Sequence, residues 1–599
     1  RVYGHVDQPL VDMYRGILWV LLAGLLAMGM VAFRGKYRFA PQVLPKASSR
    51  SEAQHRLLSL PATDAGPGDH PDPPQGSERA DPRPKGSAGK RVRTPGLLSN
   101  VRAFDWYRAK AAGALQPNVV SHMTIQKMAP DRDPQLHFLF GVQLPVGNDT
   151  FASEVVIMDS EGGVVATKSF PGYRMWLAVM ANSTTLYGLA TASDTDWDWL
   201  KTAHFVLYNF QTGVRLEIPL EGGTHWLEFD VHSGTLLWLK NRFLQINCDK
   251  VDRKLAAAKQ TGAALVCPER FITSKVRHSH VVSDDIIETD LQSKQTFVWD
   301  VFDRLARKKE PLFKFQPIPM RKWRGKSRGH PDYVHANCVF RDHEENAVYL
   351  NSLSLSSIFK ISRATGELSW VIGEHTGTFR MFDEHGKQIP RIFKLAHSLN
   401  YMGNNTFLIF DNEGGLVHGE GGSRLVKFKV DEADRTARIL WQWTPSTKAE
   451  NEGLHRGNGG GTHPLLDGAV VGAFGQPWTQ YLVEVRGQEQ VMNIRIEDAF
   501  VQDITAFYDR PVLKLAASDA RTITVECYSP FRLLRRSPAT LLVRSVCPGA
   551  TEETQHALQF RPFWQPTLVS VAIPRGHVEL ILRNVDGLEG YLELDRPCP

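Results

Sequence analysis

Three histidines begin or interrupt β-prone runs instead of lying on an apolar face: His225 in GGTHWLEFD, His335 in YVHANCVFRD and His397 in KLAHSLNYMG. A neutral imidazole can act as a nucleophile, and it can also donate or accept a proton. One such histidine alone is more often a hydrogen-bonded structural group. Three at the same place within their repeats make a shared active site an equally good interpretation.

The elements that must position these histidines are antiparallel hairpins. Long helical patterns are nearly absent, and the hairpins recur at irregular spacing, which favours the blades of a β-propeller over a solenoid of fixed period. Each hairpin joins two apolar alternations through a turn of Asp, Ser, Thr or Gly type. The six runs are FASEVVIMDSEGGVVATKSF, HFVLYNFQTGVRLEIPL, IIETDLQSKQTFVWDVF, SIFKISRATGELSWVIG, LVKFKVDEADRTARILWQW and YLVEVRGQEQVMNIRIE.

The pattern therefore predicts an all-β chain with a six-bladed β-propeller over residues 99–515. The innermost strands of a propeller converge on a central channel, so polar side chains from several blades can meet on its axis. Successive side chains of a strand point to opposite faces. We therefore expect His335 and Asn337 to point the same way and to line one mouth of the channel.

The chain on either side of this region has a different character. Residues 516–599 hold strand-like runs without the hairpin plan and predict a small β-sandwich. Residues 46–98 are rich in Pro, Gly, Ser and charge, which predicts a disordered linker. Within residues 1–45, the uncharged run Gly16–Phe33 is just long enough for a transmembrane helix and predicts a signal anchor, with a cleaved signal peptide as the competing interpretation.

Two signals disagree about which side of the membrane carries the bulk of the chain. The basic residues Arg34, Lys36 and Arg38 favour a cytoplasmic position for the chain beyond the anchor. Glycosylation sequons favour a lumen or the cell exterior. We expect a single-pass membrane protein whose folded bulk is luminal or extracellular, with sequons at Asn148, Asn182 and Asn404.

Composition excludes several other classes of protein. The net charge of +6 lies partly in the linker, so no nucleic-acid partner is inferred. The six cysteines include no CxxC pair, and the sequence suggests neither a zinc site nor a thioredoxin-like motif. In an oxidising compartment, spacing suggests two disulfide pairs, Cys248 with Cys267 and Cys527 with Cys547.

Two further motifs have plain structural interpretations. The run GNGGGTH, ending at His463, could cradle a phosphate, but no strand–loop–helix pattern surrounds it and an ordinary loop is favoured. Asp284 and Asp285 could bind a metal ion, but no further ligands follow at a recognisable spacing. A turn between strands is the favoured interpretation there.

Several of these stretches together resemble the arylsulfotransferase family. The resemblance covers roughly residues 204–510. It depends on the order of three elements, HAN at residues 335–337, then AH followed by FDN, then SR in SRLVKFKVDE, each of which is weak alone. Neighbouring stretches that look like adjacent blades are SDDIIETDLQSKQTFVWDVFD and GNGGGTHPLLDGAVVGAFG.

The resemblance implies a nucleotide-independent sulfotransferase without a cofactor or a metal. Its partners would be an aryl sulfate donor and a phenolic acceptor, joined by a sulfated histidine intermediate and ping-pong kinetics. His397 falls on the nucleophile position. His335, His225 and Asn337 fall on positions that hold the sulfate oxygens and assist proton transfer, and substrate-binding roles are expected for Arg424 and Thr462.

One position departs from the family pattern. An arginine normally follows the HxN motif on the next strand, where this chain has Leu353. A guanidinium recognises such oxygens with paired hydrogen bonds, so its loss weakens anion binding. The alternative function is therefore a catalytically inactive propeller that binds a ligand or a partner.

Overall fold

The computed structural model describes the second of the chain's two compact units, residues 95–599, over most of its length. The predicted anchor, the linker, Asn148, Cys248 and Cys267 lie outside the described residues. Within them, no helix is long and apolar enough to cross a membrane. The described ranges are 122–147, 150–192, 203–247, 278–307, 334–373, 378–412, 422–445, 454, 459–476, 479–519, 521–547, 550–572 and 576–595.

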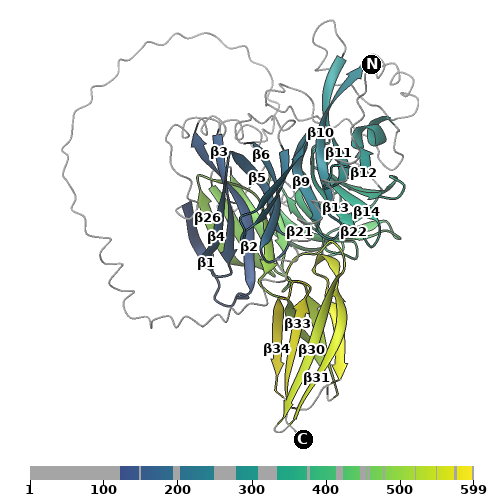
Figure 1. Cartoon of the computed structure of the whole chain (residues 1–599). Coiled ribbons are helices and arrows are strands. Elements are labelled where there is room, and N and C mark those ends of the chain that lie inside the picture. The colour runs from purple at the N-terminus through teal and green to yellow at the C-terminus, as the bar shows by residue number, and fades with distance from the viewer. Residues whose placement is uncertain are drawn as a thin grey trace, which may run out of the picture. The chain divides into compact units, whose positions relative to one another are not determined.

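The described chain is all-β, as the hairpin pattern predicts. Its named helical elements are one short π-helix, Asp303–Arg307, and one 3-10 turn, Pro562–Trp564. Strands fill most of the rest of the described residues and form sheets mainly from strands that are consecutive in the chain (Figure 1).

Six sheets make up the larger part of the fold. The first three consist of β27 (Phe500–Tyr508), β2 (Leu136–Gly147), β3 (Thr150–Asp159) and β4 (Val164–Pro171); β5 (Tyr173–Met180), β6 (Thr185–Ala192), β7 (Ala203–Asn209) and β8 (Arg215–Leu220); and β9 (Gly223–Asp230), β10 (Thr235–Asn247), β11 (His278–Asp290) and β12 (Gln295–Asp300).

The next three sheets continue the same plan. They consist of β13 (Ala336–Asp342), β14 (Ala347–Ser352), β15 (Ser357–Ser362) and β16 (Leu368–Gly373); β19 (His397–Tyr401), β20 (Thr406–Asp411), β21 (Arg424–Asp431) and β22 (Thr436–Trp443), extended by β17 (Arg380–Phe382) and β18 (Gln388–Ile389); and β23 (Gly461–Pro464), β24 (Val470–Gln476), β25 (Thr479–Arg486) and β26 (Glu489–Glu497), extended by β1 (Met123–Met128).

One edge strand of each sheet faces a common centre. These inner strands, β5, β9, β13, β19, β23 and β27, contact one another in that order, and β27 contacts β5 again. The ring closes because β27, from the end of this region, pairs antiparallel with β2 from its beginning. A closed ring of twisted antiparallel sheets is the architecture of a β-propeller.

The six hairpins predicted from sequence are confirmed. They form the third and fourth strands of each sheet, counted from the inner strand, namely β3–β4, β7–β8, β11–β12, β15–β16, β21–β22 and β25–β26. Local turn chemistry explains them. Asp159, for example, accepts hydrogen bonds from the backbone N–H groups of Glu161 at 3.0 Å and Gly163 at 2.7 Å. Gly162 supplies the positive φ of 84° that this turn requires.

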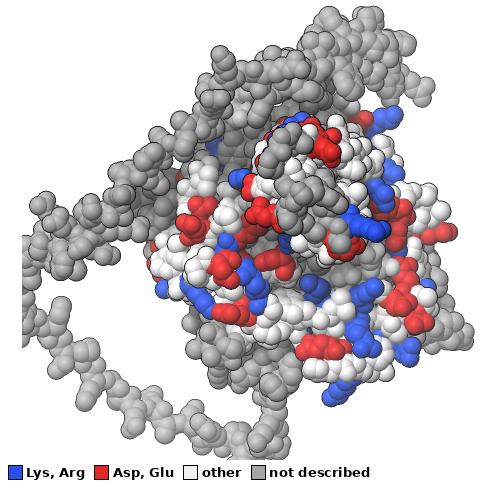
Figure 2. Space-filling model, turned by 90° about the horizontal axis from the view of Figure 1, so that it is seen from below, with Lys and Arg blue, Asp and Glu red and all other residues white. Residues whose placement is uncertain are grey.

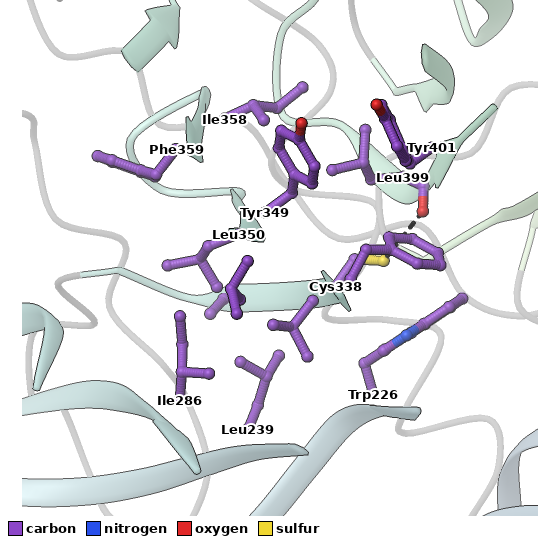
Figure 3. Close-up of a cluster of buried hydrophobic side chains, with 14 of the residues drawn as sticks. Trp226, Leu239, Ile286, Cys338, Tyr349, Leu350, Ile358, Phe359, Leu399 and Tyr401 are labelled. Carbon is purple, nitrogen blue, oxygen red and sulfur yellow. Dashed lines mark hydrogen bonds between the residues drawn. The ribbon is translucent and has the colours of Figure 1, made fainter. Parts of the chain in front are cut away.

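Large apolar side chains fill the space between neighbouring sheets. Figure 3 shows part of this core, including Tyr349 and Tyr401, whose rings stack at 4.8 Å. The thiol of Cys338 on β13 donates to the carbonyl of Leu399 on β19 at 3.3 Å and links two inner strands. The buried indole of Trp299 donates to the Gly366 carbonyl in the next sheet at 2.9 Å.

A second pair of sheets follows the propeller and encloses its own hydrophobic cluster. The strand β28 begins at Val512, slightly before the predicted boundary at 516, because its residues pair with β29 and not with the propeller. The two sheets are β28 (Val512–Ser518), β29 (Thr522–Tyr528) and β32 (Thr567–Ala572); and β31 (Ala550–Phe560), β30 (Ser537–Cys547), β33 (His577–Asn584) and β34 (Glu589–Leu594).

The predicted disulfide between Cys527 and Cys547 is wrong. Cys527 is a free, buried thiol on β29, whereas Cys547 is disulfide-bonded and lies at the end of β30 in the other sheet. The third cysteine in the described residues, Cys338, is also free. The partner of Cys547 therefore lies outside the described residues.

Two loops of the C-terminal sheets contact the propeller. Arg532 donates to the carbonyl of Tyr401 at 2.9 Å, and its guanidinium lies 4.8 Å from the Phe340 ring centre. The ring of Phe563 packs edge-on against Tyr401 at 5.1 Å. Arg535 forms an ion pair with Asp230. These contacts attach the C-terminal sheets to the ends of the inner strands.

A cavity of about 30 Å³ lies between Arg532 and the inner strands. This volume suffices for one or two water molecules. Unpartnered buried polar atoms line it: Glu228 Oε1, Trp226 Nε1 and His463 Nε2. This small polar cavity thus lies at the ends of the inner strands that face the C-terminal sheets.

The described surface seen in Figure 2 mixes acidic and basic side chains without a continuous patch of either sign. Ion pairs on the described surface of the molecule include Arg544 with Glu553 and Arg536 with Glu344.

Burial raises the pKa of Glu228 to about 7, although Arg341 and Arg532 oppose the shift. The folded-state pKa lies above the ordinary value of 4.5, so the native state binds this proton more tightly than the unfolded chain. This contribution to stability is complete below pH 4.5 and is lost as the pH rises through about 7.

At about pH 8.5, Glu228→Gln should therefore increase the unfolding free energy by up to about 3 kcal/mol relative to the parent chain. Its unfolding temperature should be higher than that of the parent at the same pH. The two chains should unfold alike near pH 4.5, where the parent carboxyl is protonated. Thermal unfolding across this pH range measures the difference, with the exposed Glu221→Gln as control. A constant difference at all pH values would contradict the raised pKa.

Candidate functional site

The three histidines lie at the same end of the channel. His225 is near the start of β9, His335 immediately precedes β13, and His397 is the first residue of β19. The ring centres of His225 and His335 are 4.8 Å apart, and His225 interacts electrostatically with both other histidines. The structure thus brings together the three residues that sequence position singled out.

The inner strands are bulged where these side chains enter the channel. His225, Asn337 and Ser398 have no Cα partner on the neighbouring strand. His225, His335 and Ser398 also have positive φ angles of 50°, 44° and 49°. Such conformations cost free energy in non-glycine residues and cluster at functional sites. The strand is bulged at Asn337. The alternation of side chains along a regular strand therefore does not determine whether the Asn337 and His335 side chains point the same way.

His225 is held neutral by its surroundings. Burial lowers its pKa well below the usual value, and His335 and His397 lower it further. Its Nδ1 contacts the Thr224 hydroxyl at 2.7 Å. The Trp176 ring lies 6.5 Å from the His225 ring and adds an aromatic wall to the site.

Asp284 fixes the strand that carries His335. Its Oδ2 accepts the backbone N–H of Ala336 at 2.6 Å, and its other oxygen accepts the Asn241 amide. Asp284 and Asp285 lie inside β11, so the predicted turn is wrong there. Two adjacent carboxylates suit a turn by local propensity, but contacts with β10, β12 and β13 hold them in a strand.

Asn337 connects the second and third histidine strands. Its Nδ2 donates to the carbonyl of Ala396, the residue before His397, at 2.9 Å. Asn351 donates to the same carbonyl at 2.7 Å and to Asn337 Oδ1 at 2.6 Å. Asn337 thus positions the backbone next to His397.

His397 is 2% exposed and has hydrogen-bond partners for both ring nitrogens. Nδ1 lies 2.7 Å from Asn412 Oδ1, and the backbone N–H of Gly459 donates to Nε2 at 3.3 Å. Asn412 belongs to the FDN motif. Gly459 belongs to the glycine-rich run that the sequence assigned to an ordinary loop.

Arg424 points its guanidinium into the protein beside this loop. It donates to Asp411 Oδ2 at 2.9 Å, to the Ile392 carbonyl at 2.6 Å and to Gln442. Asp411 also accepts the backbone N–H of Lys394 at 2.9 Å. The FDN and SR motifs therefore hold the segment that leads into His397.

Thr462 lies on β23 and lines the small cavity next to Arg532. Its hydroxyl donates to the Val471 carbonyl at 3.1 Å, and its backbone N–H donates to the Ser398 hydroxyl at 3.0 Å. These contacts tie β23 to β19, one residue from His397.

Leu353 is 1% exposed, in the turn after β14, and its backbone N–H donates to the His335 carbonyl at 3.0 Å. The position where the family pattern expects an arginine is therefore next to the histidines. Among the described residues, no cluster of three or more His, Cys, Asp or Glu side chains has the arrangement of a metal site.

Sequence reasoning did not assign roles to Asn412, Gly459, Asp284 or Trp176. The FDN motif was a usable signal for Asn412, because an amide close to a histidine motif can orient the ring. The other three act through contacts between distant segments, which residue spacing does not reveal.

Arg424→Met should destabilise the chain by about 3–5 kcal/mol, because it leaves the buried Asp411 carboxylate without its cation. Urea unfolding measures the loss. Arg438→Met, on the exposed face of the neighbouring strand, should change the unfolding free energy by less than about 0.5 kcal/mol. Equal effects of the two substitutions would contradict this role of the ion pair.

A search of curated proteins returned no match. Solved structures similar to this chain include TolB from Acinetobacter baumannii, at 10% identity and a TM-score of 0.34, covering 63% of this chain and 67% of that one. Another is the β-propeller domain of Cps50 (Swd1) from Myceliophteria thermophila, at 9% identity and a TM-score of 0.32, covering 64% and 90%. A third is a putative 6-phosphogluconolactonase from Bacteroides fragilis, at 10% and 0.30, covering 78% and 97%.

A protein-family model described as arylsulfotransferase (ASST) matches residues 255–450. The matched segment contains two of the three histidines, His335 and His397, together with Asn337, Asn412 and Arg424. It also contains Leu353, at the position where the sequence departs from the family pattern. This match supports the assignment of the chain to the arylsulfotransferase family.

Proposed function

We propose that this protein transfers a sulfuryl group from an aryl sulfate ester to a phenol, with His397 as the nucleophile. The observation that carries the proposal is the meeting of three histidines, His335 and His397 buried and His225 partly exposed, at one end of the inner strands. His335 and His397 lie inside the segment matched by the family model. A small-molecule donor and acceptor are implied by that family.

In the first half-reaction, His397 Nε2 forms a bond to sulfur while the bond from sulfur to the aryl oxygen breaks. The electron pair of the broken bond leaves with the phenolate. The product on the enzyme is an N-sulfated imidazolium. His225 is neutral, since burial lowers its pKa, and it can donate only one N–H to a sulfate oxygen. Donors placed in advance stabilise the charge that develops on these oxygens.

In the second half-reaction, a phenol oxygen forms a bond to sulfur while the bond from sulfur to Nε2 breaks. The phenol proton passes to a neighbouring base, and His397 returns to its neutral state. His225 or His335, which lie at the same end of the inner strands as His397, would accept this proton. Two sequential displacements at one nitrogen give ping-pong kinetics.

We assign positioning roles to Arg424 and Thr462 in place of direct substrate binding. The Arg424 guanidinium is engaged by Asp411, Ile392 and Gln442, and the Thr462 hydroxyl by Val471. Each holds backbone close to His397. Asn337 supports the same segment through the Ala396 carbonyl.

The same proposal includes the architecture and location of the chain. Each of the six sheets is taken as one blade, giving a six-bladed propeller followed by a β-sandwich. The run Gly16–Phe33 is taken as a membrane anchor, with the folded bulk luminal or extracellular. The disulfide at Cys547 supports an oxidising compartment. The sequon residues Asn182 and Asn404 lie at turns between strands, where glycans can be attached.

Leu353 supports a second candidate function, a propeller that binds a ligand without turnover. A buried leucine next to His335 supplies no charge to a sulfate group. In that case the channel would hold a sulfated ligand or a partner's side chain, and His397 would remain unmodified.

Incubation of the full chain with 4-nitrophenyl sulfate should release nitrophenol and leave a sulfuryl group on the peptide that contains His397. The adduct is measured by mass spectrometry after rapid alkaline quenching. His397→Ala should lose the adduct and at least about 10³-fold of the release rate, because no nucleophile remains. A folded parent chain that gives neither product nor adduct would favour the binding function.

Leu353→Arg should raise kcat/KM for 4-nitrophenyl sulfate by about tenfold, because a guanidinium adds a charged hydrogen bond to the sulfate oxygens. Leu353→Met is the matched control, since it keeps an apolar side chain of similar volume. Both are compared in steady-state assays after circular dichroism has shown that they fold. A folded Leu353→Arg chain that is no faster than the parent would contradict this role of the position.

A further inference from the structure

Three hydrogen bonds join His397, Asn412 and Gly459 in a closed ring. The Gly459 N–H donates to His397 Nε2 at 3.3 Å, His397 Nδ1 lies 2.7 Å from Asn412 Oδ1, and Asn412 Nδ2 donates to the Gly459 carbonyl at 2.7 Å. All three residues are buried. The ring brings together the AH motif, the FDN motif and the glycine-rich run.

The direction of every bond in this ring follows from its two backbone groups. A backbone N–H can only donate, so Nε2 of His397 must accept and carries no proton. In a neutral imidazole the proton is then on Nδ1, which donates to Asn412. The Asn412 atom that receives it must be the amide oxygen. The amide nitrogen then faces a carbonyl, which can only accept, so the ring is consistent at every step.

We infer that Asn412 is a positioning residue that selects the reactive form of His397. The ring favours the neutral imidazole with its lone pair on Nε2, because a protonated Nε2 would face the Gly459 N–H. This inference rests on the proposed function for its catalytic meaning, but the protonation pattern it specifies is a property of the resting protein.

The surrounding structure keeps the ring closed. The Ser423 hydroxyl donates to the Asn412 carbonyl at 3.2 Å, and the neighbouring Asp411 is held by Arg424. On the other side, Gly459 and Gly460 have φ angles of 76° and 105°. A Cβ at Gly460 would lie 2.6 Å from the Phe410 ring. The glycine-rich run therefore lets the backbone approach the imidazole.

The ring also has a role during the reaction. When Nε2 forms its bond to sulfur and the bond from sulfur to the aryl oxygen breaks, the Gly459 N–H releases the Nε2 lone pair, and the imidazole becomes positively charged. The Nδ1 proton stays in its hydrogen bond with the neutral Asn412 amide. A carboxylate at this place would stabilise the imidazolium even without substrate and would withdraw the free base from the resting enzyme.

Other charged groups near His397 do not replace this contact. His225 and His335 approach from β9 and β13, while Asp411 and Arg424, on β20 and β21, are paired with each other. Titratable groups on the described strands packed against β19 also include Cys338, Arg341 and Asp342 on β13, His463 on β23, and Asp503 on β27, whose carboxylate accepts the Ser398 hydroxyl.

Two measurements on the full chain test the inference. First, NMR of the parent chain labelled with nitrogen-15 in histidine should show His397 neutral, with the proton on Nδ1, its signal being assigned by its loss in His397→Gln. Second, Asn412→Asp should move the acidic limb of the nitrophenol-release profile to higher pH by about one unit or more. Asn412→Ala should lower the plateau rate about tenfold or more.

Asn209→Asp is the matched control, because it makes the same chemical change in a turn between outer strands and keeps its backbone hydrogen bonds. Its pH profile should coincide with that of the parent. A His397 proton found on Nε2, or an Asn412→Asp profile with an unshifted acidic limb, would overturn the inference. Absence of nitrophenol release by the parent would contradict the proposed function alone, since the NMR result does not depend on turnover.

Discussion

The pairing of β27 with β2 is the constraint on which the rest of the structure depends. It joins the end of the propeller region to its beginning and supplies the inner edge strand of the first sheet. Only with this pairing can the six inner strands contact one another in a closed ring. The histidines lie on or directly before three of these strands. More than a hundred residues of sequence separate His225 from His335. Closure of the ring is therefore what makes them neighbours.

Ring closure alone does not orient the histidines. The inner strands are bulged at their starts, and a bulge gives up ladder hydrogen bonds. Side chains from other segments compensate: Asp284 holds the Ala336 amide, Asn337 and Asn351 hold the Ala396 carbonyl, and Asp411 holds the Lys394 amide. The polar residues around the site thus serve two purposes, since they satisfy buried backbone groups and aim the imidazoles.

The fold was largely predictable from local patterns, and the site only in part. Each outer hairpin is encoded by strand alternation and a turn residue such as Asp159, so all six were found. The histidines stood out by residue type and place in the repeat. Their partners did not, because the contact between Asn412 and Gly459 spans 47 residues. Spacing also misled for Cys527, because sequence distance does not reveal that β29 and β30 belong to different sheets.

The loop that carries Arg532 bears on how substrates enter the site and how products leave it. Arg532 contacts the inner strands at one end and lines the small cavity there, while the histidines lie at the other end of the same strands. Under the proposed reaction, the phenol that is released and the phenol that arrives would then use the same entrance, at the histidine end of the inner strands. The two phenols compete for the same space, so slow dissociation of the released phenol delays binding of the acceptor. The choice of acceptor would then depend on the dissociation rate of the released phenol as well as on the affinity of the site for the acceptor.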